Sequence, residues 1–408
     1  MIHIGNCLET LRKMPSASVD AVVTDPPYGL GKEPKPRDVL RAWLDGEEFK
    51  PGGAGFMGKS WDAFVPSPVV WSECLRVLKP GGHLVAFAGS RTYDWIVMGA
   101  RLAGFEVRDQ LIWMYGSGMS KGFNLRRDPD CDAAGFGGFG TGLKPSHEPI
   151  VLARKPLSGT VAKNVLEHGT GAINVDGCRV AGTYQTRDRK NSGGASMFGT
   201  GAGGGAFVDT QGRWPANLLH DGSPEVLAGF PDTGAASASF RGDRAGVVTN
   251  FGGADTHRGH NDAGGSAARY YYSAKASRAE RELGLADFAP ATVGDGRKTA
   301  NDTAYQRGKT QRRNVHPTVK PVAVMRWLVR LVGGQPGSVI LDPYSGSGTT
   351  GIAAALEGFE FVGCELSPEY AEIARARIAH ARANPAMWEP DYQAPDEVPD
   401  EQLDLFGS

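Results

Sequence analysis

Short apolar runs alternate with amphipathic stretches over the first 120 residues of the chain. Apolar runs at 21–24, 83–88 and 107–115 predict buried strands. Apolar positions at helical spacing predict helices at 69–78 and 91–103, and glycines follow both helices. Strands that alternate with helices indicate a parallel sheet that is covered on both faces.

The same alternation returns toward the end of the chain. It predicts strands at 339–341 and 359–364, and helices at 321–332, 351–357 and 368–381. Neither outer segment contains enough strands for a complete sheet. We therefore expect one α/β core, a doubly wound and mostly parallel sheet that is assembled from both ends of the chain.

The segment between the two halves has a different pattern. Glycine-rich stretches at 135–142, 193–205 and 252–265 hold few apolar residues, so we expect loops there. From residue 384 onward the chain has seven Asp or Glu and no Lys or Arg, which is typical of a disordered tail. The predicted organisation is a first core half at 1–120, an inserted loop-rich region at 121–310, a second core half at 311–383 and an acidic tail at 384–408.

Composition narrows the class of protein. Hydrophobic residues make up 40% of the 408 positions, which is ordinary for a soluble protein. No apolar run reaches about 18 residues and no basic stretch precedes an apolar one at the N-terminus, so we expect neither a membrane-spanning helix nor a signal peptide. The five cysteines include no Cys-x-x-Cys pair, which argues against a structural zinc site and a disulfide framework and fits the cytoplasm.

Charge is distributed unevenly along the chain. The formal net charge is −1, but residues 121–321 carry 26 Lys and Arg against 19 Asp and Glu, a net charge of +7. The remainder carries 18 basic and 26 acidic residues, a net charge of −8. Because a DNA duplex attracts basic side chains where it docks, the middle of the chain is the expected DNA contact. Ordinary scatter of charge over about 200 residues is the alternative.

A glycine turn follows the predicted strand at 339–341. The strand runs into Asp342, and the turn contains Gly346 and Gly348, whose lack of a side chain permits close backbone approach to a ligand. No Lys-Ser or Lys-Thr pair follows, unlike a phosphate-binding loop. The next strand ends at Glu365, at a spacing suited to a carboxylate that bonds ribose hydroxyls. Together these features predict a nucleoside site.

A second chemical motif, Asp25-Pro26-Pro27-Tyr28, ends the predicted strand at 21–24. The prolines stiffen the turn. The Asp25 carboxylate and the Pro26 carbonyl are two acceptors for the N–H groups of a flat amine, and Tyr28 can stack on its ring. The alternative is a simple turn with a surface tyrosine. Beside a nucleoside site, the motif predicts methyl transfer from S-adenosylmethionine to the exocyclic amine of a DNA base.

These motifs resemble the amino-methylating DNA methyltransferases of the β class, in which the catalytic motif precedes the cofactor motif. Residues 25–28 match the catalytic motif, 342–348 match the cofactor loop, and 314–321 match the segment before that loop. The resemblance covers most of both outer segments. It implies a permuted Rossmann-like core with an inserted target-recognition region, and a target base that is flipped out of the duplex.

The resemblance also implies roles for individual residues. Asp25, Pro26, Pro27 and Tyr28 would be catalytic. The cofactor S-adenosylmethionine would be held by Asn6, Cys7, Asp25, His316, Thr318, Lys320, Asp342, Tyr344, Gly346, Gly348, Thr349 and Glu365. Family members usually have Asp where this chain has Asn6, so the contact with the cofactor adenine would pass to an amide oxygen. His316 has no partner at metal-ligand spacing, and we expect no metal.

An Asp in the first position of the catalytic motif implies adenine N6 as the target. Cytosine N4 on the same scaffold is the alternative, and a DNA-binding regulator without turnover is a further one. The implied partners are double-stranded DNA and a second copy of the chain, and the resemblance includes the enzymes of restriction-modification systems. The segment Gln402 to Phe406 resembles the pentapeptide that binds the bacterial sliding clamp. We therefore expect an enzyme of the cytoplasm that is associated with the nucleoid.

Overall fold

The computed structural model is built around a nine-stranded sheet with the strand order β1-β15-β14-β2-β3-β5-β4-β6-β11. It describes residues 1–52, 60–118, 122–180, 212–235, 239–241, 256–258, 264–274, 279–293 and 310–389. In sheet order, the strands are β1 (Ile2–Ile4), β15 (Glu360–Glu365), β14 (Val339–Asp342), β2 (Val19–Thr24), β3 (Leu78–Phe87), β5 (His147–Arg154), β4 (Glu106–Met114), β6 (Leu218–His220) and β11 (Tyr272–Ser273).

The sheet is mostly parallel, as the sequence predicts. Only β5 runs against its neighbours, β3 and β4, and the other neighbouring pairs are parallel. The helices are α1 (Cys7–Lys13), α2 (Pro36–Leu44), α3 (Pro68–Val77), α4 (Tyr93–Leu102), α5 (Pro129–Cys131), α6 (Val161–His168), α7 (Pro224–Leu227), α8 (Val322–Val332), α9 (Thr349–Leu356) and α10 (Pro368–Ala383). Three two-stranded sheets pair β7 (Asp232–Thr233) with β10 (Gly265–Ser266), β8 (Ser239–Arg241) with β9 (Thr256–Arg258), and β12 (Ala291–Val293) with β13 (Thr310–Arg312).

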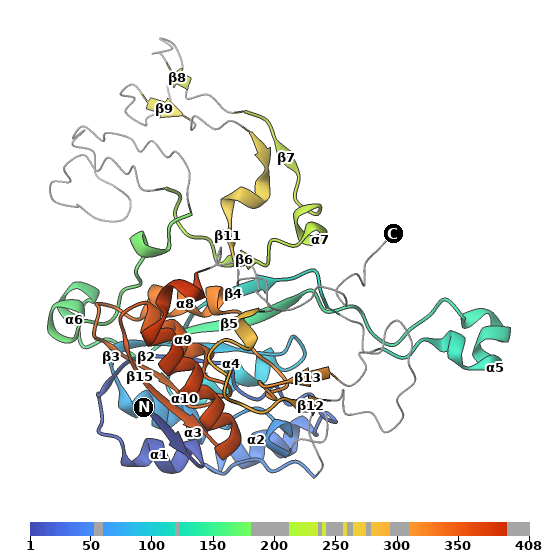
Figure 1. Cartoon of the computed structure of the whole chain (residues 1–408), viewed down its shortest axis with the longest axis horizontal. Coiled ribbons are helices and arrows are strands. Elements are labelled where there is room, and N and C mark those ends of the chain that lie inside the picture. The colour runs from blue at the N-terminus through green and yellow to red at the C-terminus, as the bar shows by residue number, and fades with distance from the viewer. Residues whose placement is uncertain are drawn as a thin grey trace.

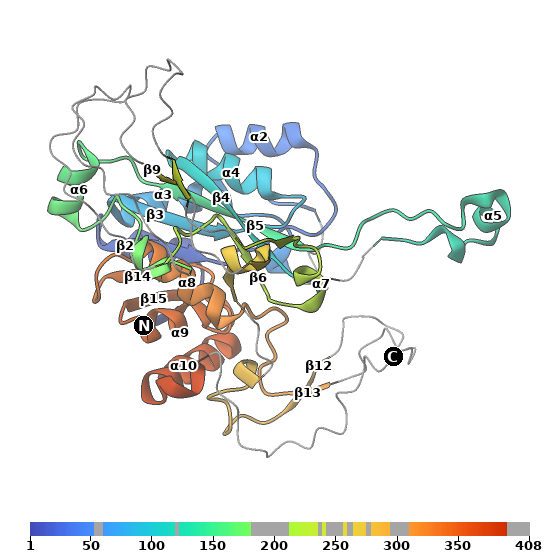
Figure 2. The same ribbon diagram turned by 90° about the horizontal axis from the view of Figure 1, so that it is seen from above.

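Helices cover both faces of the sheet, which confirms the doubly wound architecture. Figure 2 shows α2, α3 and α4 on one side of the strands and α8, α9 and α10 on the other. Successive residues of a strand point to opposite faces. Val85 and Phe87 therefore join the core under α8, α9 and α10, while Leu84 and Ala86 join the core under α3 and α4. Strands buried on both faces explain the unbroken apolar runs in the sequence.

The two halves of the chain meet in the middle of the sheet. In the register of β14 against β2, Ile340 lies opposite Ala21 and Leu341 lies opposite Val22. This pairing places the end of β2, where Asp25 follows, beside the end of β14. The order of the strands along the chain and in the sheet is that of the permuted core that the sequence predicts.

The region at 121–310, which the sequence indicates is an insertion, contributes three strands to the sheet. β5 lies between β3 and β4, and β6 and β11 form one edge. The predicted boundary at residue 121 therefore falls inside the β4–β5 hairpin, whose connecting arm carries α5 and projects from the sheet (Figure 1). The short apolar run of β5 stands among glycine-rich stretches, and we did not predict it.

The described structure also continues past the predicted start of the acidic tail. A 3₁₀ helix, Pro385–Trp388, follows α10, and the side chain of Trp388 is buried. Residues 390–408 lie outside the described residues. No helix among the described residues combines the length and the apolar character needed to cross a membrane.

The core position of β5 can be tested by substitution. Ile150→Ala should lower the free energy of unfolding by about 2–5 kcal/mol, because Ile150 is 0% exposed and its truncation leaves a cavity between the sheet and the helices. The matched control is Leu166→Ala on α6, where the side chain is 89% exposed and the expected change is within about 0.5 kcal/mol. Urea unfolding measures both, and equal midpoints would contradict the assignment of β5 to the core.

Candidate active site

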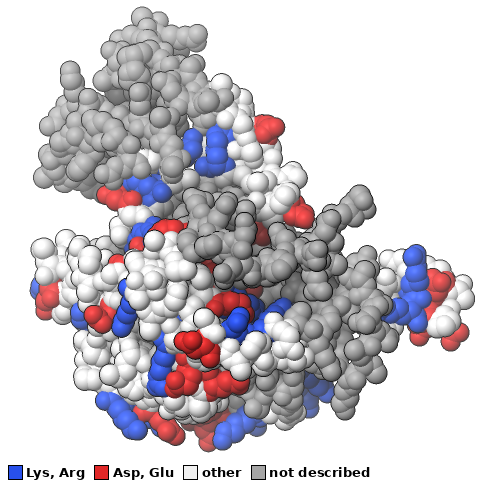
Figure 3. Space-filling view, in the orientation of Figure 1, with Lys and Arg blue, Asp and Glu red and all other residues white. Residues whose placement is uncertain are grey.

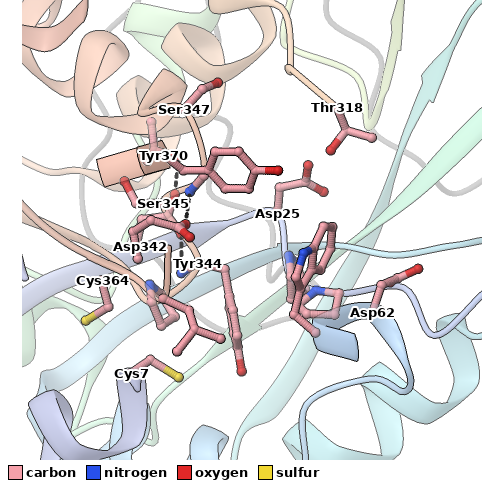
Figure 4. Close-up of a pocket in the computed structure, with 18 of the residues that line it drawn as sticks. Cys7, Asp25, Asp62, Thr318, Asp342, Tyr344, Ser345, Ser347, Cys364 and Tyr370 are labelled. Atoms are coloured by element: carbon pink, nitrogen blue, oxygen red, sulfur yellow. Dashed lines mark hydrogen bonds between the residues drawn. The ribbon is translucent and has the colours of Figure 1, made fainter. Parts of the chain in front are cut away.

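A cavity of about 540 Å³ lies where the central strands end. Residues that follow β2, β14 and β15 line it, together with the segment before α8. In an open α/β sheet the carboxyl ends of the parallel strands form the edge at which ligands bind. Figure 4 shows side chains from both halves of the chain converging there, with Asp25 between Tyr370 and Thr318.

The carboxylate of Asp342 organises the loop after β14. Its Oδ1 accepts hydrogen bonds from the Thr24 hydroxyl at 2.6 Å and from the Tyr344 N–H at 3.0 Å, and the Thr350 hydroxyl donates to Oδ2. Burial raises the pKa of Asp342 to about 6, although the hydrogen bonds from Thr24 and Thr350 act in the opposite direction. Asp342 therefore fixes the loop after β14 and ties it to β2, with both of its oxygens already engaged.

Glu365 ends β15 and faces the glycine loop. Its Oε2 accepts the N–H of Gly346 at 2.8 Å, and its Oε1 accepts the N–H of Ser367 at 2.9 Å. These bonds orient the carboxylate, and each oxygen retains capacity for a further donor. Burial raises the pKa of Glu365. Gly346 has a φ of 52°, a left-handed conformation that favours glycine, and it lines the cavity.

Gly348, predicted to contact the cofactor, does not belong to the lining of the cavity. It is the N-cap of α9 with a φ of 83°. A Cβ at this position would lie 2.8 Å from the Cβ of Ala374 on α10. The physical requirement for glycine at 348 is therefore close packing of α9 against α10, in addition to the left-handed turn.

Asn6 and Cys7 line the cavity at the start of α1. The side-chain oxygen of Asn6 accepts the N–H of Leu8 at 2.9 Å, which caps the helix. The oxygen that we expected to face the cofactor is thus already used as a cap acceptor. Burial raises the pKa of the Cys7 thiol, although its hydrogen bond with Tyr344 lowers it.

His316 forms an aromatic wall of the cavity. Its ring is stacked on Trp61, with centroids 6.4 Å apart, and meets the ring of Tyr370 edge-on at 4.6 Å. Its Nδ1 bonds the carbonyl of Thr318. Burial lowers the pKa of His316 to about 4, so the imidazole is neutral near pH 7. Within the described part of the chain, no group of three or more His, Cys, Asp or Glu is placed to hold a metal ion.

Lys320, predicted to contact the cofactor, also contacts two carboxylates in the cavity. Its Nζ is 2.8 Å from Oδ2 of Asp25 and 3.1 Å from Oε2 of Glu148, the second residue of β5. The other oxygen of Asp25, Oδ1, is buried and has no hydrogen-bond partner within the described structure. The proposed catalytic carboxylate is thus anchored through one oxygen and free through the other.

Hydrogen bonds with the side chains of Asp62, Thr92 and Glu148 fix the turn that carries Tyr28. Asp62 accepts the N–H groups of Tyr28 and of the following glycine, and the Thr92 hydroxyl donates to the Tyr28 carbonyl at 2.7 Å. The Tyr28 hydroxyl donates to Oε2 of Glu148 at 2.9 Å. Nζ of Lys320 lies 5.2 Å from the centre of the Tyr28 ring. The ammonium lies over one face of the ring, so a base that stacks on Tyr28 must use the opposite face.

The two carboxylates shift the pKa values of the groups that they contact. Burial alone would lower the pKa of the Lys320 ammonium, but Asp25 and Glu148 together raise it above its ordinary value. Burial, followed by the same two carboxylates, raises the pKa of the Tyr28 hydroxyl well above its usual value. Lys320 is therefore a cation and Tyr28 a neutral donor near pH 7.

With the exception of Gly348, every residue predicted for the site lines this one cavity. These residues are Asn6, Cys7, Asp25, Pro26, Pro27, Tyr28, His316, Thr318, Lys320, Asp342, Tyr344, Gly346, Thr349 and Glu365. Sequence reasoning missed Trp61, Asp62, Glu148 and Tyr370, which line it as well. Glu148 did carry a signal, because it stands at the start of a short apolar run. Because β5 is antiparallel to β3 and β4, it begins at the edge of the sheet where they end, and this places Glu148 at the cavity.

Comparisons with known proteins identify the family of the chain. A family model described as DNA methylase matches residues 19–376. DNA adenine methyltransferase YhdJ of Escherichia coli (strain K12) is 40% identical over 379 residues, which cover 93% of this chain and 82% of that protein. Type II methyltransferase M.SmaI of Serratia marcescens is 46% identical over 67 residues, covering 16% of this chain and 23% of that protein. The solved PvuII DNA methyltransferase (cytosine-N4-specific) is 13% identical, with a TM-score of 0.44 and coverage of 95% of this chain and 93% of that one. This chain belongs to the DNA methylase family.

Proposed function

We propose that this DNA methylase transfers a methyl group from S-adenosylmethionine to the N6 amine of an adenine that has been flipped out of duplex DNA. The observation that carries the proposal is the position of Asp25. Asp25 lines the same cavity as Glu365 and the glycine loop after Asp342, and its buried Oδ1 has no hydrogen-bond partner within the described structure. An acceptor for an amine therefore stands beside a site suited to a nucleoside.

The cavity fits S-adenosylmethionine on independent grounds. A volume of about 540 Å³ is within the range of small-molecule sites. Gly5 lines the cavity, and a Cβ there would meet nothing within 4 Å, so the wall leaves open space for a ligand. In this proposal Glu365 accepts the ribose hydroxyls, and His316 and Thr318 contact the methionine end. When bound, S-adenosylmethionine supplies a methyl group activated by a positively charged sulfur.

In this proposal, two acceptors of the catalytic motif make the amine of the base more nucleophilic. Asp25 and the Pro26 carbonyl accept the two N–H groups, which favours a pyramidal nitrogen whose lone pair is no longer conjugated with the ring. The Lys320 contact fixes one oxygen of Asp25 and leaves the other for the amine. Asp62 and Thr92 hold the turn in place, so the two acceptors are positioned before the base arrives.

Adenine is favoured over cytosine by two observations. The first motif residue is Asp25, and Asp in this position is commonest among adenine-N6 enzymes of the family that the sequence resembles. The relative with 40% identity over 379 residues is named an adenine methyltransferase. Cytosine N4 is the second candidate, because both bases present a flat exocyclic amine to the same acceptors.

We also propose that the arm between β4 and β5 contacts the DNA. β4 is parallel to β3, so the arm leaves the sheet at the edge that carries Asp25. Its tip combines Arg126 and Arg127 with exposed aromatic rings, and Phe136 and Phe139 are 50% and 60% exposed. Figure 3 shows basic and acidic side chains together on the tip of this arm. Basic and aromatic groups are those that contact phosphates and bases.

Three further expectations belong to this proposal. The chain works in the cytoplasm, on the nucleoid, where its substrate lies. A homodimer is implied by the family resemblance. The segment Gln402 to Phe406, which lies outside the described residues, binds the sliding clamp, and such tethering would raise the local concentration of the enzyme on DNA.

The catalytic assignment is tested on unmethylated duplex DNA. The wild-type protein should produce N6-methyldeoxyadenosine, measured by mass spectrometry of the digested nucleosides. Asp25→Ala should abolish this product because it removes the acceptor that prepares the amine, while cofactor binding is largely retained. Asp109→Ala, an exposed change on β4, is the control and should keep full activity. A product of N4-methyldeoxycytidine would overturn the adenine assignment, and substantial turnover by Asp25→Ala would overturn the role of Asp25.

The cofactor site is tested by removing its carboxylate. Glu365→Ala should weaken binding of S-adenosylmethionine by roughly ten- to hundredfold, the loss expected for a charged acceptor worth about 1.5–3 kcal/mol. Calorimetry measures the affinity. Glu360→Ala, at the exposed start of the same strand, is the matched control. Unchanged affinity of Glu365→Ala would remove this residue from the site.

Clamp binding is tested with the whole chain. A fluorescence titration against a bacterial sliding clamp should give micromolar affinity, because the acidic tail offers Leu403, Leu405 and Phe406 as apolar anchors. Leu405→Ala combined with Phe406→Ala should remove the binding and leave methyl transfer to short DNA unchanged. Wild-type protein that does not bind the clamp, or a double variant that binds equally well, would rule the interaction out.

A further inference from the structure

Two carboxylates share a single ammonium at the centre of the cavity. Nζ of Lys320 is 2.8 Å from Asp25 and 3.1 Å from Glu148, and the three side chains are only 10%, 22% and 20% exposed, respectively. The hydroxyl of Tyr28 donates to the same oxygen of Glu148 that Lys320 contacts. These groups come from the end of β2, the start of β5 and the segment before α8. The cluster has a formal charge of −1.

A structural ion pair would need only one of these acids. Like charges near one another in a partly buried site repel, and each ion loses solvation, so an extra carboxylate costs stability unless a cation offsets it. Nζ of Lys320 and the Tyr28 hydroxyl both contact Oε2 of Glu148, so one ammonium and one hydroxyl are shared between the two carboxylates of the cluster. The cluster therefore holds one negative charge more than its own ammonium neutralises.

We propose that Glu148 supplies the negative charge that matches a cationic ligand in this cavity, so that the site prefers a sulfonium over a neutral thioether. The proposal rests on the proposed function, in which the methyl donor carries a positive sulfur and the amine becomes positive as it accepts the methyl group. The positive charge passes with the methyl group from the sulfur to the amine, and the same net charge of −1 balances it on either atom. The methylated amine then releases one proton to solvent. After transfer the product is a neutral thioether, which the cluster holds less tightly.

Three other titratable groups near the cluster do not supply this charge. His316 is neutral near pH 7, with a pKa of about 4 caused by burial. Burial raises the pKa of Tyr115, on the β4 side, to about 12, so this hydroxyl is neutral as well. The carboxylate of Asp342 is bonded through both oxygens to hydroxyl and backbone donors of its own loop and of β2. Glu148 is the carboxylate that stands across Lys320 from Asp25.

The test is the ratio of two affinities measured by calorimetry on the full chain. S-adenosylmethionine carries the sulfonium, and S-adenosylhomocysteine is the same molecule with a neutral sulfur. Glu148→Gln keeps the shape of the side chain and removes its charge. It should reduce the preference for the sulfonium by roughly five- to tenfold, as expected for one charge a few ångströms away in a partly buried site. A loss of packing alone would weaken both ligands equally.

Two further variants change the charge in other ways. Lys320→Gln makes the cluster more negative and should raise the preference for the sulfonium. The double variant Glu148→Gln, Lys320→Gln has the wild-type net charge and should return the ratio toward the wild-type value. Glu106→Gln, which removes an acid paired with Arg154 at the far end of the β4–β5 hairpin, is the control and should leave the ratio unchanged.

An unchanged ratio in Glu148→Gln, or an equal loss for both ligands, would overturn the inference. If Glu148→Gln does not fold, a ratio in Lys320→Gln that fails to rise would overturn it instead. Failure of the proposed function is a separate result, since in that case the wild-type chain would bind neither ligand or would leave DNA unmethylated. A wild-type chain that methylates DNA while Glu148→Gln keeps the full sulfonium preference would refute this inference alone.

Discussion

The pairing of β2 with β14 is the contact on which the rest of the site depends. Val22 lies opposite Leu341 in this pairing, and the hydroxyl of Thr24 donates to Asp342 at 2.6 Å. The paired residues are about 320 positions apart in the sequence. Because the two strands are parallel and adjacent, the residues that follow them emerge side by side at one edge of the sheet. For this reason Asp25 and the glycine loop after Asp342, the amine acceptor and the cofactor loop of the proposed function, lie next to each other.

The carboxylates of the site illustrate how position decides role. Asp342 is buried and bonded through both oxygens, so it shapes a loop. Glu365 is oriented by two backbone N–H groups and keeps acceptor capacity. Asp25 is anchored by Lys320 through one oxygen and keeps the other free. Under the proposed function, the three carboxylates thus serve folding, cofactor binding and amine activation, according to which hydrogen bonds each has already made.

The sequence predicts those parts of the site that follow strongly apolar strands. Asp25 and Glu365 end such strands, and their position at the ligand edge follows from the fold class. Glu148 could not be placed in the same way, because it begins a short strand within a glycine-rich region and its role depends on an antiparallel neighbour pairing. The predicted role of Gly348 was incomplete, since its contact with Ala374 depends on the packing of α9 against α10, which sequence spacing does not fix.

The most direct test of the account is a crystal structure of the protein with S-adenosylhomocysteine. The account predicts that the ligand lies in the cavity shared by the two halves of the chain, with its ribose hydroxyls bonded to Glu365 and its sulfur on the side of Asp25. A ligand bound elsewhere, or one whose ribose faces away from Glu365, would contradict the claim that the ends of β2, β14 and β15 build a single active site.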